Sequence, residues 1–199
     1  MFYAIRIVLF LVGVFVLVVV LVRKHKAKKA AVVGSVFLYF ALISVITVFP
    51  VENLFYTFDS PYDAFDYIGD GQVVDVLYGK ESAFVVYSRD GKSFDKCIMN
   101  KSGDGYKLPE YYAAKQVFHS FGRAGNFIVY RARRTDDYYL RATITTTDDT
   151  TPNVENYGEQ VYIRRIDFGF FAMYSRIENY GSEYAIFVNG ERIALAESK

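Results

Sequence analysis

Paired carboxylates are the first residues in this sequence whose type and spacing could do chemistry. They occur as Asp136-Asp137 and as Asp148-Asp149. Neighbouring carboxylate oxygens can bind Ca²⁺, and two carboxylates across a cleft can hydrolyse a glycoside. Neither pair has the spaced Asp, Asn and Gly residues of a defined calcium loop, and both lie in stretches that are typical of turns. We therefore interpret both pairs as turn residues and predict no metal site.

Nucleophilic and general-base chemistry has equally little support. His119 is the only histidine after residue 50, and Ser120 follows it. Successive residues of a strand point to opposite faces, so these two side chains would diverge. Cys97 is the only cysteine. It excludes an intramolecular disulfide, and no base is implied beside it. The sequence therefore indicates no catalytic residue and no cofactor.

Basic side chains offer a better case for binding. The densest basic group after residue 50 is Arg131, Arg133, Arg134 and Arg141, and the first two share one face of a predicted strand. Guanidinium groups could bind an anionic polymer or a phosphate headgroup. The alternative is a solvated outer face beside Asp136.

Tyrosine is unusually frequent in the same region. Sixteen of the 18 tyrosines follow residue 50. A tyrosine ring suits protein partners and could suit sugar rings, although tyrosine is also a common strand residue. The candidate binding residues are Tyr138, Tyr139, Arg131, Arg133 and Arg141.

The elements that would position these residues are mainly strands. After Gly71 the apolar residues recur with period two, which predicts strands. The predicted ranges are 73–78, 83–88, 93–99, 116–121, 127–134, 138–147, 159–167, 168–177, 184–188 and 192–195, with an exposed loop over 147–157. The short connections, above all Asn189-Gly190, favour antiparallel hairpins.

One short helix is predicted before the strands. Ser60 is a good N-cap, Pro61 suits the first helical position, and the helix should run to Ile68 and stop at Gly69. We expect a mainly β domain over 51–199, either a sandwich or partly closed barrel, or a curved sheet with one short helix. A cluster of Pro and Gly suggests a possible seam near 109–125.

Charge divides the chain sharply. Residues 1–50 contain six basic residues and no acidic one, a charge of +6, whereas residues 51–199 contain 17 basic and 22 acidic residues, a charge of −5. The acidic balance of the second part disfavours nucleic-acid binding.

The first part contains two apolar runs, over 2–22 and 30–49, separated by a basic loop over 23–29. Because about 20 apolar helical residues span a bilayer core, these runs predict a transmembrane helical hairpin. The basic loop predicts a cytoplasmic turn, with both termini and residues 51–199 outside a cell membrane that the chain crosses twice. The predicted membrane-interface residues are Arg6, Arg23, Lys24, Lys26, Lys28, Lys29, Phe55 and Tyr56.

A resemblance adds to this interpretation. The segment from Ser60 to Tyr67 precedes Val73-Val74-Asp75-Val76 and the run from Ser82 to Tyr87. Together these segments resemble small, uncharacterised membrane-anchored proteins of Gram-positive bacteria, in which an SPxxAF-type helix precedes a strand meander. The resemblance covers about 30 residues. It implies a bacterial envelope location and carries over no catalytic residue, and the double span departs from the single anchor of that group.

These observations favour a non-enzymatic binding or interaction module, tethered to the lipid bilayer and engaging a membrane or envelope protein. Two alternatives stay open. One is an envelope hydrolase or transferase built on acidic residues, which would require two close carboxylates in a deep pocket. The other is a ligand sensor that acts through a membrane partner.

Overall fold

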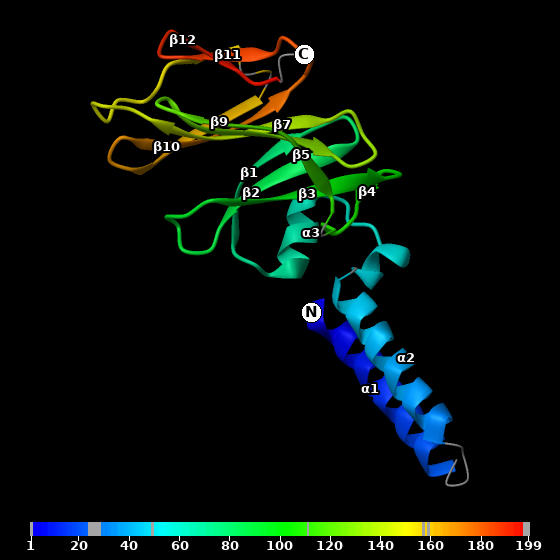
Figure 1. The fold of residues 1–199 in the computed structure, drawn as a ribbon. Coiled ribbons are helices and arrows are strands. Elements are labelled where there is room, and N and C mark those ends of the chain that lie inside the picture. The colour runs from blue at the N-terminus through cyan, green and yellow to red at the C-terminus, as the bar shows by residue number, and fades with distance from the viewer. Residues whose placement is uncertain are drawn as a thin grey trace.

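The fold is a stack of β-sheets from which a long helical hairpin projects (Figure 1). The structure is a computed structural model, and it describes residues 2–23, 29–48, 50–110, 112–156, 158 and 160–196. Starting from the hairpin, the layers are a short helix, a four-stranded sheet, a five-stranded sheet and a three-stranded sheet. The prediction of a mainly β, antiparallel domain is confirmed.

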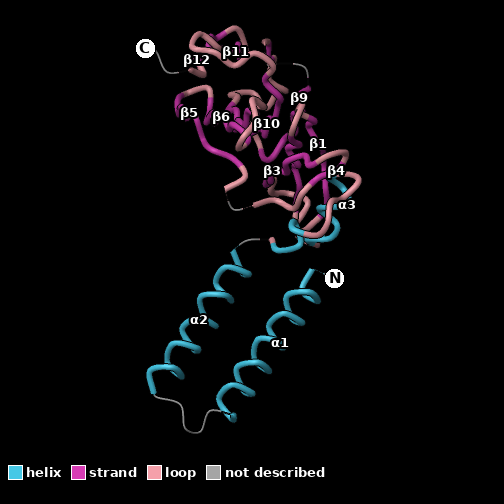
Figure 2. Tube along the Cα trace, turned by 90° about the vertical axis from the view of Figure 1, so that its right-hand side faces the viewer, coloured by secondary structure: helices cyan, strands magenta, loops and turns pink. Residues whose placement is uncertain are grey.

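The hairpin consists of α1 (Phe2–Arg23) and α2 (Lys29–Val48), which lie side by side in both views (Figures 1 and 2). Gly13 allows the two helices to approach closely. A Cβ atom at Gly13 would lie 2.8 Å from Cε2 of Tyr39, so a side chain there would require that ring to shift. Phe10 completes this contact, with its ring centroid 6.2 Å from that of Tyr39.

The prediction that this hairpin spans a membrane is wrong. Crossing a bilayer requires about 20 consecutive apolar helical residues. Among the residues that the structure describes, no helix combines the length and the apolar character needed to cross a membrane. The two spans, the multi-pass location and the membrane-interface roles of Arg6, Arg23, Lys29, Phe55 and Tyr56 are corrected accordingly. The other three predicted interface residues, Lys24, Lys26 and Lys28, lie outside the described residues.

Two short helices join the hairpin to the sheets. The first is the 3₁₀ helix η1 (Val51–Leu54), and the second is α3 (Pro61–Ile68). The predicted caps of α3 are confirmed. The Ser60 hydroxyl accepts a hydrogen bond from the Asp63 backbone N–H at 3.1 Å, and Gly69 ends the helix with a φ of 67°, a left-handed conformation that glycine adopts at little cost.

The strands form three antiparallel sheets. The first has the order β1 (Gln72–Tyr78), β2 (Ser82–Ser88), β3 (Asp95–Ser102) and β4 (Gly105–Tyr106). The second has the order β5 (Ala114–Gly122), β6 (Gly125–Ala132), β7 (Tyr138–Thr145), β10 (Phe170–Ile177) and β9 (Gln160–Asp167). The third has the order β12 (Glu191–Ala194), β11 (Ala185–Val188) and β8 (Val154–Glu155). The two-residue strands β4 and β8 were not predicted, and β8 lies in the predicted loop over 147–157.

Three hydrophobic cores separate the layers, and alternation along the strands explains them. Every residue of β2 is buried. Ala83, Val85 and Tyr87 pack toward α3, whereas Phe84 and Val86 pack toward the second sheet. The second sheet is likewise covered on both faces, because its other side packs against the third sheet. The domain is therefore a stack of three sheets with α3 on one side, rather than a sandwich of two sheets.

Candidate functional site

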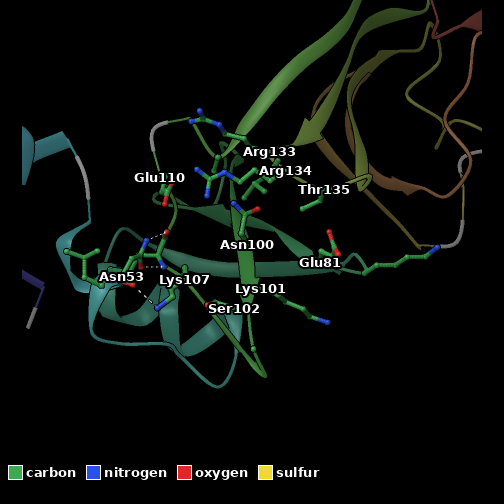
Figure 3. Close-up of a pocket in the computed structure, with 16 residues that line it drawn as sticks. Asn53, Glu81, Asn100, Lys101, Ser102, Lys107, Glu110, Arg133, Arg134 and Thr135 are labelled. Carbon is green, nitrogen blue, oxygen red and sulfur yellow. Dashed lines mark hydrogen bonds between the residues drawn. The ribbon is translucent and has the colours of Figure 1, made fainter.

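A cavity of about 650 Å³ opens where the first sheet meets the loop between β6 and β7 (Figure 3). Its walls come from η1, from the turn between β1 and β2, from β3, from the segment after β4, and from the β6–β7 loop. The lining residues are Asn53, Leu54, Lys80, Glu81, Ile98, Asn100, Lys101, Ser102, Gly103, Lys107, Leu108, Glu110, Ala113, Arg133, Arg134 and Thr135. A cavity of this volume is within the range of small-molecule sites.

The carboxylate of Asp137 fixes the geometry of one wall. Its two oxygens accept hydrogen bonds from the backbone N–H groups of Lys80 and Glu81, both at 2.8 Å. The Ser82 hydroxyl donates to the same carboxylate, also at 2.8 Å. Asp137 is 4% exposed, so these three donors replace the water that its charge requires. The β6–β7 loop is therefore joined to the β1–β2 turn.

Two arginines project from this loop. Arg133 is anchored through its backbone, because its N–H donates to the Ala113 carbonyl at 2.8 Å. Arg134 has a φ of 65°, which is a costly conformation for a residue with a Cβ atom. Figure 3 shows Arg133, Arg134 and the Asn100 amide at the same end of the cavity. Both arginines are exposed, so their charges face solvent and the cavity.

Asn100 supplies a polar group from the cavity floor. Its carbonyl group accepts from the Lys107 N–H at 3.0 Å, which fixes the backbone. In the described part of the chain, no group bonds the buried side-chain oxygen of Asn100. A buried polar atom without a partner is costly, and an amide oxygen only accepts hydrogen bonds, so this oxygen suits a donor group of a bound molecule and does not itself bond an anion.

The opposite wall is rigid. The Asn53 side chain brackets Leu108, because Nδ2 donates to the Leu108 carbonyl at 3.0 Å and Oδ1 accepts from the Leu108 N–H at 2.7 Å. The Lys107 ammonium donates to the carbonyls of Asn53 and Tyr56 at 2.7 and 2.9 Å. Carbonyl groups do not neutralise this ammonium, so its charge remains beside the cavity.

The charge of the lining is opposite to that of the domain. Five lining residues are basic and two are acidic, a net charge of +3, whereas residues 51–199 carry −5. Glu110 lies at the arginine end and Glu81 at the other end (Figure 3). The two carboxylates therefore do not converge on one point, as an acid and base pair would have to do.

The structure separates the predicted binding residues. Arg133 lines the cavity. Arg131 lies behind it and donates to the Thr135 carbonyl at 2.9 Å and to Asp136 at 2.7 Å. Tyr138 stacks on Tyr180 with ring centroids 4.7 Å apart.

The other two predicted binding residues contribute to the packing. Tyr139 is fully buried, and its hydroxyl lies 2.9 Å from the Ser82 hydroxyl. Burial raises the pKa of Tyr139. Arg141 is half-buried beside the hydroxyl of Tyr174, away from the cavity lining. Arg133 is the selected candidate that lines the cavity; Arg134 was named in the basic group but not selected, and Asn100 was not considered.

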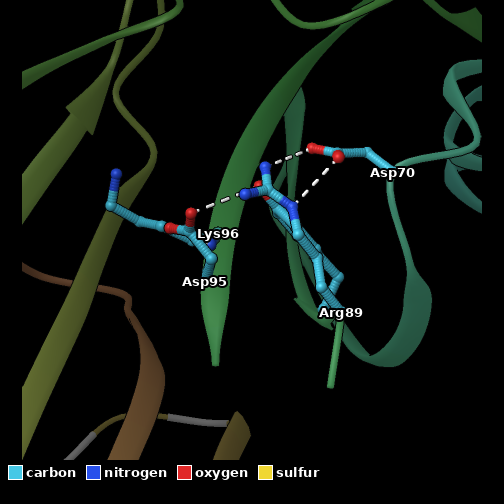
Figure 4. Close-up of polar contacts among 5 residues, drawn as sticks. Asp70, Arg89, Asp95 and Lys96 are labelled. Atoms are coloured by element: carbon cyan, nitrogen blue, oxygen red, sulfur yellow. Dashed lines mark hydrogen bonds and ion pairs between the residues drawn. The ribbon is translucent and has the colours of Figure 1, made fainter. Parts of the chain in front are cut away.

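A second polar cluster lies on β2 and β3 (Figure 4). Arg89 donates to the Asp70 carboxylate through Nε at 3.0 Å and through Nη2 at 2.6 Å, which ties the segment after α3 to the end of β2. The Tyr87 hydroxyl donates to Asp95 at 3.3 Å. Burial, followed by the charge of Asp95, raises the pKa of Tyr87 to about 12.

Lys96 extends this cluster toward the second sheet. Its ammonium lies 4.0 Å from the ring centroid of Tyr130, a cation–π distance. Burial, and then the nearby charge of Arg141, lowers the pKa of Lys96. These contacts connect the segment after α3, the strands β2 and β3, and β6 of the second sheet. We therefore interpret the cluster as structural.

Three other residues that were considered for chemistry, Asp149, His119 and Cys97, have structural contacts or environments instead. Asp149 accepts from the Gly169 N–H at 2.7 Å and pairs with Arg165 at 2.7 Å. His119 bonds Asn126 across the β5–β6 hairpin at 2.8 Å. Burial raises the pKa of the Cys97 thiol to about 12, which disfavours the nucleophilic thiolate.

No group of three or more His, Cys, Asp or Glu residues that could hold a metal ion occurs among the described residues. Comparison of the chain with protein-family models, with curated proteins and with solved structures finds no match.

Proposed function

We propose that the β-domain is a binding module for a small anionic ligand, held in the cavity by Arg133 and Arg134. The observation that carries this proposal is the presence of two exposed guanidinium groups at one end of a cavity whose lining carries a net positive charge. The guanidinium forks suit carboxylate and phosphate groups, which they bond in a bidentate manner.

The backbone of Arg134 supports the same proposal. A turn position with a φ of 65° is one that glycine or asparagine fills at lower cost. Strained residues occur where a side chain has a use that offsets the strain. An arginine here places a permanent charge at the mouth of the cavity, because its guanidinium does not lose its proton in proteins.

A hydrolase or transferase built on carboxylates is less well supported. The buried Asp137 is occupied by three donors, Asp149 is paired with Arg165, and the two glutamates of the cavity lie at opposite ends. Binding of an anion does not require a free carboxylate. It requires the basic side chains that line the cavity.

The test is a calorimetric titration of the full chain with citrate and with pyrophosphate at low salt. These probes carry carboxylates and phosphates respectively, so they also distinguish the two ligand chemistries. We expect at least one to bind, and the double variant Arg133→Gln with Arg134→Gly to weaken binding by about tenfold or more. The matched control is Arg123→Gln, because Arg123 is exposed in the β5–β6 turn and does not line the cavity.

Two outcomes would contradict the proposal. One is the absence of binding for both probes. The other is binding that Arg123→Gln weakens as much as the double variant does, because the anion would then respond to general surface charge. Urea unfolding of each variant shows that a lost affinity reflects the site and not a lost fold.

A further inference from the structure

A second concave surface lies at the far end of the molecule, on the third sheet. It is an open groove of about 580 Å³ between that sheet and the loop that joins β10 to β11. The lining residues are Asn156, Asn179, Gly181, Ser182, Glu183, Tyr184, Ala185, Phe187 and Arg192. It shares no lining residue with the arginine cavity.

An aromatic ring lies on the sheet face of this groove. Phe187 is on β11, the central strand, where it pairs with Arg192 of β12 and with Glu155 of β8. Residues paired directly across strands have neighbouring side chains. Phe187 is 37% exposed although its strand neighbours Ile186 and Val188 are buried, so an apolar surface is open to a ligand with charged groups on both sides.

Hydrogen bonds fix the part of the groove where the β10–β11 loop enters β11. The Tyr184 hydroxyl donates to the Asn156 carbonyl at 2.9 Å, and Nδ2 of Asn156 donates to the Ala185 carbonyl at 2.5 Å. Burial raises the pKa of Tyr184 to about 12, so this hydroxyl keeps its proton well into the alkaline range. The end of the β10–β11 loop is therefore tied to the segment after β8, so this part of the groove is fixed by the fold.

The lining indicates the chemistry of an occupant. Glu183 and Arg192 contribute opposite charges, so the groove has no net charge, in contrast to the arginine cavity. The carboxylate accepts hydrogen bonds, the guanidinium donates them, and the Asn179 amide and Ser182 hydroxyl do both. A neutral ligand that is rich in hydroxyl groups matches such a mixed set.

A peptide fits this groove less well. Extended peptides add to the free edge of a sheet. The floor of this groove is β11, whose backbone already pairs with β8 and β12, so it offers no free edge there. A sugar ring, by contrast, has a C–H face that can lie on an aromatic ring and hydroxyl groups around its rim that bond polar side chains.

We propose that this groove binds a neutral saccharide, with one sugar ring lying on Phe187 and its hydroxyl groups bonded by Glu183, Arg192 and Asn179. The inference does not depend on the anion site, because the two sites share no residue and differ in charge. Cavities with an aromatic surface and a few convergent polar groups are the usual form of such sites.

The experiment is an NMR titration of the full chain with cellotetraose, chitotetraose, maltotetraose and mannotetraose, with tetraalanine as the peptide probe. We expect one or more sugars to bind with a Kd of the order of 1 mM and to shift signals of the 179–192 segment. Phe187→Ala should weaken this binding by about tenfold. Its matched control is Phe168→Ala, which removes an exposed phenylalanine outside the groove.

A second variant keeps the test independent of Phe187. Nothing lies within 4 Å of a Cβ atom added at Gly181, so Gly181→Leu should fold and fill the groove. Gly122→Leu is its control, because that position is equally open and lies elsewhere. The proposal is overturned if no sugar binds, if tetraalanine binds as well as the sugars, or if Phe187→Ala and Gly181→Leu leave sugar binding unchanged. Variants of Arg133 and Arg134 should not alter sugar binding. The saccharide proposal can therefore fail without contradicting the proposed anion site.

Discussion

Ser82 and Asp137 are joined by a hydrogen bond of 2.8 Å that connects the first sheet to a loop of the second. Ser82 begins β2 in the first sheet, and Asp137 precedes β7 in the second. The same carboxylate bonds the backbone of the β1–β2 turn. This contact holds the loop that presents the two arginines of the cavity, so it links the packing of the sheets to the proposed site.

Replacing that carboxylate should therefore cost stability. Asp137→Asn should lower the free energy of unfolding by about 2–3 kcal/mol, because an amide offers one acceptor where the carboxylate offers two and places an N–H group against backbone donors. The control is Asp136→Asn, since Asp136 is exposed and its ion pair with Arg131 should contribute less than about 1 kcal/mol. Urea unfolding measures both, and equal losses in the two variants would disprove this role of Asp137.

Arg134→Gly should separate stability from binding. Glycine adopts the φ of 65° without the clash of a Cβ atom, so the variant should unfold with a free energy equal to or about 1 kcal/mol above that of the parent. Its affinity for citrate or pyrophosphate should fall at the same time. Unfolding and calorimetry on one preparation test both effects, and a variant that is less stable yet binds normally would contradict the account of this residue.

The stability should fall at alkaline pH. Burial raises the pKa of Tyr87 and of Tyr184 from 10 to about 12. Because the unfolded chain then loses these protons first, their contribution to stability is fully present below pH 10 and is lost as the pH rises from 10 to 12. Urea unfolding over this range, with tyrosinate absorbance as the monitor, tests the sign. Tyr87→Phe should reduce the fall of the unfolding free energy with pH. Tyr62→Phe, which alters an exposed ring, should leave that fall unchanged.

Gly125 should tolerate no side chain. Its φ is 137°, and a Cβ atom would overlap the carbonyl oxygen of Thr143 on β7. Gly125→Ala should therefore cost about 3 kcal/mol or more in the free energy of unfolding. Gly122→Ala, in the same hairpin but with open space around the added atom, should change it by less than about 0.5 kcal/mol. Similar thermal unfolding curves for the two variants would contradict the close approach of Gly125 to the Thr143 carbonyl.

The sequence allowed prediction of elements that local chemistry decides. Ser60, Pro61 and Gly69 predicted the bounds of α3 correctly, and Asn189-Gly190 predicted a hairpin whose two residues have φ values of 50° and 82°. The strands β4 and β8 could not be predicted, because two residues give no measurable alternation. The apolar runs before residue 50 predicted the two helices correctly, whereas the membrane crossing predicted from them is wrong.

The candidate site depended on contacts that no local pattern reveals. Arg133 was selected from a basic cluster, yet Asn100, which lines the same cavity, lies more than 30 residues earlier, on β3. Tyr139 was selected as a binding residue and is buried instead. Alternation shows that one face of β7 is apolar, but it cannot show that a second sheet covers the other face.

The anion site is tested most directly by observing the arginine side chains themselves. An NMR titration with pyrophosphate that follows the Nε–Hε signals should shift those of Arg133 and Arg134, together with the side-chain amide of Asn100. The signals of Arg123 and Arg192, outside the cavity, should stay in place. Shifts spread evenly over all arginines, or shifts that miss Arg133 and Arg134, would contradict the proposed binding site.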